Sequence, residues 1–208
     1  DLGYGWGTEA LDYDNDGYLD ILVVNGNNRI PAKSYYVPNL KHNDLDELFK
    51  NNGDGTFTAV GAKEGLSGNE IKMSAAVADY NNDGFPDIFI PVYGNRHPTN
   101  LSMLYKNKGN DNHWLTIQLI GTKSNRDAVG ARITLKVNGR KQIREVISGS
   151  SYVSQSSPWP MFGLGKSTHI ESLEIRWPSG IVQTLTNIPI DQKIIVKEGD
   201  QTIHQAKL

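Results

Sequence analysis

The feature that most constrains this chain is an acidic nine-residue loop that occurs twice in the same register. The first copy runs Asp12-Tyr13-Asp14-Asn15-Asp16-Gly17-Tyr18-Leu19-Asp20, and the second runs Asp79-Tyr80-Asn81-Asn82-Asp83-Gly84-Phe85-Pro86-Asp87. In both copies, oxygen-bearing side chains occupy positions 1, 3, 5 and 9, and glycine occupies position 6. Four carboxylates in nine residues repel one another, so the first copy is costly to fold without a cation.

This spacing predicts a calcium ion in each loop. Alternate side chains converge when the backbone curls around one point, and glycine permits the sharp bend. Ca²⁺ takes roughly 6–8 hard oxygen ligands, and the carbonyl at position 7 supplies one of them. The predicted ligands are Asp12, Asp14, Asp16, the Tyr18 carbonyl and Asp20 in the first loop, and Asp79, Asn81, Asp83, the Phe85 carbonyl and Asp87 in the second. Because an amide replaces one carboxylate in the second loop, we expect it to bind calcium more weakly.

The loops are not EF-hands, because position 12 holds Val23 or Ile90 instead of a bidentate glutamate. The alternative is a pair of turns rich in Asp and Asn that bind no metal. Two copies in one register favour calcium.

The sequences around the two loops also correspond. An apolar run follows each loop, at 21–24 and 88–90, and residues 48–53 resemble residues 104–109. Self-similarity of this length in a turn-rich chain predicts blades of a β-propeller. Propellers close with roughly 4–8 blades, so residues 1–108 are expected to form the last blades, completed by upstream sequence or by another chain. We expect both apolar runs to be buried on both faces.

From residue 109 the pattern changes to alternating apolar and polar residues. Strands are predicted at 113–119, 131–137, 143–147, 172–177, 181–185 and 192–197, the last being the final strand. Asn138-Gly139 is typical of a two-residue hairpin turn. Residues 109–208 are therefore predicted to form a β-sandwich.

Composition excludes several classes of function. The chain has no cysteine, which removes disulfide frameworks and thiolate metal sites. It has no run of 18 apolar residues, so no membrane span is expected. Residues 1–108 carry 15 Asp and Glu against 9 Lys and Arg, and residues 109–208 carry 8 against 12. The basic half lacks an arginine run, so nucleic acid is not an expected partner.

Other residue types offer little catalytic chemistry. The five histidines show no zinc-site spacing, and no Gly-x-Ser-x-Gly motif is present. Gly163 and Gly165 precede no helical pattern and are interpreted as a pair of turn glycines. The aromatic residues of the long blade loops are candidates for contact with a glycan or a protein partner; they are Tyr35, Tyr36 and Tyr93.

The doubled loop and the strand after it resemble the calcium loops of FG-GAP (VCBS-type) repeats, which form blades of integrin-α-like β-propellers. Residues 48–57 resemble the segment that closes such a repeat. The second half resembles the ASPIC/UnbV domain of the cartilage acidic protein-like family. The matching segments are 112–115, 121–132, 148–155, 162–165 and 177–180.

This resemblance implies an all-β chain: a partial β-propeller of two FG-GAP-type blades (1–108), followed by a β-sandwich-like ASPIC/UnbV domain (109–208). It implies a secreted, periplasmic or cell-surface protein in which calcium is structural and the function is binding, adhesion or scaffolding without catalysis. The partner would be a protein or a glycan. The alternative is a catalytic or accessory part of a calcium-dependent polysaccharide-active enzyme; its nearest catalytic candidates are Tyr18, Tyr93, Arg96 and His97.

Overall fold

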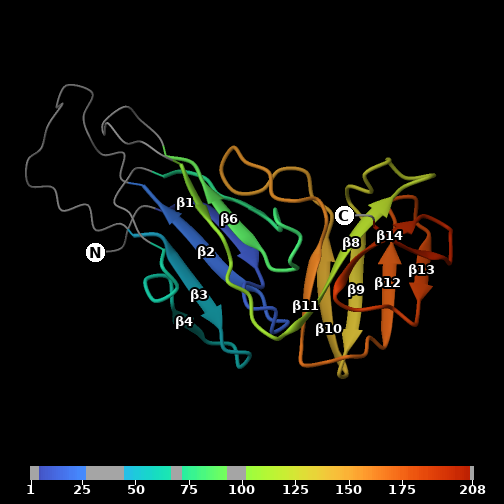
Figure 1. Cartoon of the computed structure of the whole chain (residues 1–208). Helices are drawn as coiled ribbons and strands as arrows, with labels where there is room; N and C mark the ends of the chain where they lie inside the picture. The colour runs from blue at the N-terminus through green and yellow to red at the C-terminus, as the bar shows by residue number, and fades with distance from the viewer. Residues whose placement is uncertain (1–4, 27–44, 67–71, 93–101, 207–208) are drawn as a thin grey trace, which may run out of the picture.

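The computed structural model describes residues 5–26, 45–66, 72–92 and 102–206, and every regular element in these segments is a β-strand (Figure 1). The strands form four sheets. The all-β class is confirmed, with two blade-like sheets in the first half, called here the repeats, and a two-sheet sandwich in the second. No helix in the described segments has the length and hydrophobicity needed to cross a bilayer.

The first repeat is an antiparallel sheet in the order β1-β2-β3-β4. Its strands are β1 (Gly5–Leu11), β2 (Asp20–Asn25), β3 (Glu47–Asn51) and β4 (Phe57–Ala59). The first acidic loop closes the β1–β2 hairpin, because Leu11 pairs with Asp20. A tight turn follows β3, and Gly53 and Gly55 adopt positive φ there. Only glycine adopts such angles without steric cost.

The second repeat has three strands in the order β5-β6-β7. They are β5 (Ala76–Ala78), β6 (Asp87–Ile90) and β7 (Met103–Tyr105). The second acidic loop again closes the hairpin of the first two strands, since Ala78 pairs with Asp87. The repeat in the sequence is therefore a repeat in the structure.

The two repeats stack through opposite faces. Leu22 is fully buried in the cluster that they share, whereas its equivalent Phe89 is 42% exposed. Conversely, Ile88 is buried in that cluster, whereas its equivalent Ile21 is 39% exposed. Burial on both faces, which the apolar runs predicted, is wrong within this chain, because each sheet is covered by one neighbouring repeat. Head-to-tail stacking of this kind leaves two different faces open at its ends.

The second half packs two four-stranded sheets over one apolar core. One sheet has the order β11-β8-β14-β15 and the other β10-β9-β12-β13. The strands are β8 (His113–Ile120), β9 (Arg132–Val137), β10 (Arg140–Glu145), β11 (Met161–Gly165), β12 (Ser172–Arg176), β13 (Val182–Leu185), β14 (Gln192–Lys197) and β15 (Ile203–Gln205). Alternating side chains from both sheets fill the core, as the sequence pattern predicted.

Two details of the sandwich differ from expectation and one agrees. The Asn138-Gly139 hairpin turn is confirmed, with both residues at positive φ. The strand at 192–197 is not the final one, because β15 pairs with it; three residues are too few to show a period. The interpretation of Gly163 and Gly165 as turn glycines is wrong, because both lie in β11.

Glu198 fastens the loop after β8 to the end of β14. Its Oε2 accepts hydrogen bonds from the backbone N–H groups of Thr122, Lys123 and Ser124 at 2.7, 2.7 and 2.8 Å. Burial raises the pKa of the Glu198 carboxyl, but these hydrogen bonds outweigh it and hold the pKa well below its usual range. Part of the 121–132 motif is thus a backbone cradle for one carboxylate.

Candidate metal centre

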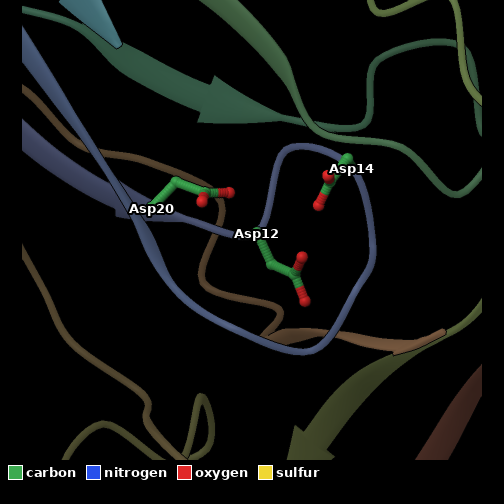
Figure 2. Close-up of side chains that lie close together, drawn as sticks. All are labelled: Asp12, Asp14 and Asp20. Carbon is green, nitrogen blue, oxygen red and sulfur yellow. The ribbon is translucent and has the colours of Figure 1, made fainter. Parts of the chain in front are cut away.

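Three carboxylates of the first loop meet in one place, as Figure 2 shows. One oxygen from each of Asp12, Asp14 and Asp20 lies within 4.8 Å of the others. Antiparallel pairing of β1 with β2 brings the two ends of the loop side by side. Among the described residues, no other group of three acidic or histidine side chains comes this close.

Carboxylates of the first loop also hold its own backbone in a curl. Asp12 Oδ2 accepts a hydrogen bond from the Gly17 N–H at 2.9 Å, and Asp14 Oδ1 accepts one from the Asp16 N–H at 3.3 Å. Asn15 and Gly17 adopt positive φ of 56° and 90°. Asparagine and glycine tolerate this conformation best, which is why they occupy these two positions between the aspartates of the loop.

Asp20 ties the loop to the next strand. Its Oδ2 accepts from the Tyr13 N–H at 3.0 Å, and its Oδ1 accepts from the Asn51 N–H at 2.8 Å. The Asn51 side chain also donates to the Leu19 carbonyl at 3.0 Å. Sequence reasoning missed this role of Asn51. The similarity of residues 48–53 to residues 104–109 was the signal that could have revealed it.

The second loop repeats the same hydrogen bonds. Asp79 Oδ2 accepts from the Gly84 N–H at 2.8 Å, as Asp12 does from Gly17. Asp87 accepts from the Tyr80 N–H at 3.2 Å and from the Asn107 N–H at 2.7 Å. The loop geometry therefore follows from the register of the motif in both copies.

The two loops differ at their third position. The Asn81 amide donates to the Asp83 carboxylate at 2.7 Å, so one predicted ligand of the second loop is engaged with another. Within the described residues, the second loop forms no cluster of three carboxylates like that of the first.

The residues at position 7 were predicted to bind calcium through their backbone carbonyls, and their side chains point to other contacts. The Tyr18 ring centroid lies 3.8 Å from the Arg140 guanidinium, and the Phe85 side chain is buried.

Burial strongly affects the acidic groups of the first loop. It raises the pKa of Asp12 to about 7, against the opposing charge of Arg144, and it raises the pKa of Asp20 to about 6. Burial also raises the pKa of Asp79 and Asp87 in the second loop. Desolvated carboxylates of this kind are held in the charged form by a bound cation.

The donor set of the first loop fits calcium. Asp12 Oδ1 is buried and has no hydrogen-bond partner, and leaving such an oxygen unsatisfied costs about 1–3 kcal/mol. The oxygens of Asp14 and Asp20 lie beside the same carboxylate. Hard oxygen ligands converging from one short loop suit Ca²⁺ better than softer metals.

Lys50 of β3 provides a positive charge at this site. Its ammonium contacts the Asp14 carboxylate and lies 2.8 Å from Asp16 Oδ2. Partial burial lowers the pKa of Lys50, but the hydrogen bonds to these two carboxylates outweigh it and raise the pKa. The equivalent Lys106 is exposed and forms no ion pair with any described carboxylate. Sequence reasoning did not identify Lys50, because loop spacing does not show which neighbouring strand approaches.

Several other predicted candidates cannot be placed on this site. The aromatic and catalytic candidates of the blade loops lie outside the described residues; they are Tyr35, Tyr36, Tyr93, Arg96 and His97. Tyr18 is described and belongs to the first loop itself.

Comparison with known proteins matches both halves of the chain. Residues 12–90 match the model of the FG-GAP-like repeat, and residues 121–203 match that of ASPIC and UnbV. The chain is 32% identical over 181 residues to cartilage acidic protein 1 of Xenopus tropicalis and 28% identical over 173 residues to that of Homo sapiens. These matches cover 84% and 82% of this chain but 26% and 24% of the relatives, so the chain spans about a quarter of their length. The relatives' name describes no reaction.

Proposed function

Because this chain belongs to the FG-GAP-like repeat proteins that carry an ASPIC/UnbV segment, we propose that it is a calcium-stabilised, non-catalytic binding or scaffold protein outside the cytoplasm. The observation that supports calcium best is the convergence of Asp12, Asp14 and Asp20, together with the buried Asp12 Oδ1 that lacks a hydrogen-bond partner. The second loop shares the hydrogen-bond pattern of the first, which supports a second, weaker site.

The role of the bound ion would be structural. It would neutralise the carboxylates of each loop and fix the hairpin that the loop closes. In the first repeat the ligand Asp20 is also bonded to Asn51, so the same site would tie β1 and β2 to β3. The proposed ligands of the two ions are Asp12, Asp14, Asp16, Tyr18 and Asp20, and Asp79, Asn81, Asp83, Phe85 and Asp87.

The proposed location and activity rest on the relatives. Their name refers to cartilage, a tissue consisting largely of extracellular matrix, which supports a secreted or surface location for this chain. A calcium ion used for stability rather than chemistry is consistent with a module that presents a rigid surface to a protein or a glycan.

Calorimetric titration of calcium into the chelator-stripped chain tests the proposal. We expect two sites, with Asp12→Asn removing the first and Asp79→Asn the second. Asp54→Asn, in the exposed β3–β4 turn, is the matched control and should retain both sites. Absence of heat and of any calcium-dependent thermal shift in the unmodified chain would contradict the proposal.

A further inference from the structure

The first loop lies directly on strand β11 of the sandwich. Asp12 Oδ2, which accepts from Gly17 within the loop, also accepts from the Gly163 N–H at 3.1 Å. The Gly165 N–H donates to the Asn15 carbonyl at 2.8 Å. One carboxylate therefore joins the loop to a strand 151 residues away in the chain.

This contact requires glycine. A Cβ atom at Gly163 would overlap the Asp12 carboxylate and the backbone of Asn15. Any side chain at this position of β11 would push the loop off the sandwich. The requirement gives the Phe162-Gly163-Leu164-Gly165 motif a role that its sequence did not reveal.

A second contact from the sandwich encloses the loop. The Arg140 guanidinium donates to the Asp16 carbonyl at 3.3 Å and lies 3.8 Å from the Tyr18 ring. A Cβ atom at Gly17 would overlap that guanidinium, so the loop backbone also approaches β10 closely. Arg140 and Gly163 thus hold two sides of one loop.

The surface that receives the loop is braced inside the sandwich. The buried Gln142 side chain of β10 donates to the Gly163 carbonyl at 2.7 Å. This bond crosses between the two sheets, because β10 and β11 belong to different sheets. The sandwich therefore presents Gly163 from a fixed position.

We infer that calcium binding by the first loop and docking of the sandwich onto the repeats are coupled, so that each strengthens the other. This coupling rests on the proposed calcium site. Gly163 and Arg140 act in it as positioning residues, because their contacts with the first loop set the calcium affinity of that loop. Asp12 offers Oδ1 to the cation while Oδ2 is held by Gly163, so an undocked sandwich leaves this ligand without one of its supports. Coupling free energies are reciprocal, so loss of the ion in turn weakens docking.

The second loop serves as an internal control. Trp114 of the sandwich packs against Gly84, yet none of the hydrogen bonds to the Asp79 or Asp87 carboxylates comes from the described strands of the sandwich. The coupling is therefore expected to be specific to the first site.

Calcium titrations of the full chain carrying Gly163→Ala or Arg140→Met test the coupling. We expect Gly163→Ala to weaken the first site about 10-fold or more, within the usual range of coupling energies, and Arg140→Met to weaken it less. The second site should change by less than about 2-fold. Val182→Ala is the control, because this side chain is 54% exposed on β13, at the opposite edge of its sheet from the β10 strand that carries Arg140. Arg140→Met alters no core residue, so it reports on the contact even where Gly163→Ala impairs folding.

A direct measure of docking completes the test. The chain has no cysteine, so Thr58→Cys and Thr184→Cys place spin labels on exposed positions of β4 and β13. We expect one narrow distance distribution with calcium, a broader one with chelator, and a broad one in Gly163→Ala under both conditions. If calcium fills both sites but chelation leaves the distances unchanged, the coupling is refuted and the proposed function stands. If no calcium binds, both are refuted.

Discussion

Replacing Lys50 with methionine is expected to change the stability of the calcium-free and calcium-bound protein in opposite directions. The Lys50 ammonium is paired with Asp14 and Asp16, two of the proposed ligands. In calcium-free protein it offsets the repulsion among the carboxylates. In calcium-bound protein it lies beside a divalent cation of the same sign. Lys50→Met should therefore destabilise the first state and favour the second.

The size of the effect follows from the distances. The ammonium lies 2.8 Å from Asp16 Oδ2, and a calcium ion sits roughly 2.4 Å from its ligand oxygens, so the two cations would be about 5 Å apart. A unit charge and a divalent ion at that separation repel by about 2 kcal/mol in a water-like dielectric. Movement of the flexible lysine into solvent relieves part of this energy. We expect the affinity of the first site to rise by about 10-fold, and the calcium-free protein to lose about 1 kcal/mol of stability.

Calorimetry and thermal unfolding, each with calcium and with chelator, measure these two effects. Lys106→Met is the matched control, because the equivalent lysine of the second repeat is exposed and forms no ion pair with the described carboxylates. A first site whose affinity is unchanged or lower in Lys50→Met would refute the role assigned to this lysine.

Three further predictions concern pH and the exposed faces. Because burial raises the folded-state pKa values of Asp12 and Asp20 to about 7 and about 6, calcium-free protein should lose stability as pH rises from about 4 to 7, and saturating calcium should abolish or reverse this slope in thermal unfolding. The folded-state pKa of Glu198 is lowered, so the ionised Glu198 carboxylate stabilises the fold above about pH 4.5, and this contribution is lost as pH falls further. Glu198→Gln should therefore make the stability of the fold depend less on pH below 4.5, as measured by unfolding. An unchanged pH dependence would contradict this. Phe89 and Leu104 are 42% and 53% exposed on the open face of the second repeat, so Phe89→Glu with Leu104→Glu should reduce self-association in light scattering, and equal association would place the contact elsewhere.

The part of the fold that is local in the chain could be predicted from the sequence. The two loops, their register and the hairpins that they close follow from a spacing of nine residues and from glycine at position 6. Asn138 and Gly139 specify a two-residue hairpin turn, because both tolerate the positive φ that this turn requires. Alternation of apolar and polar residues identified most strands of the sandwich, because one side of each strand faces a single core.

The rest depends on which distant segments meet. Gly163 is required because the first loop approaches its backbone, and no local pattern in β11 names that neighbour. Lys50 reaches the site through pairing of β3 with β2, which the loop spacing does not encode. Phe89 is exposed because only one repeat of the described residues packs on its sheet, and it packs on the other face. In each case the local sequence fits more than one partner, and tertiary packing decides between them.

The most direct test of the central claim is the thermal unfolding of the unmodified chain across a range of calcium concentrations. An ion at about 100 times its Kd stabilises the folded state by about 2.7 kcal/mol per site. For a chain of this size that corresponds to a rise in Tm of roughly 5–10 °C. We predict this rise, and its loss in Asp12→Asn at the calcium concentration that saturates the first site alone. A Tm that stays the same from chelator to saturating calcium would contradict a structural calcium ion in the first loop.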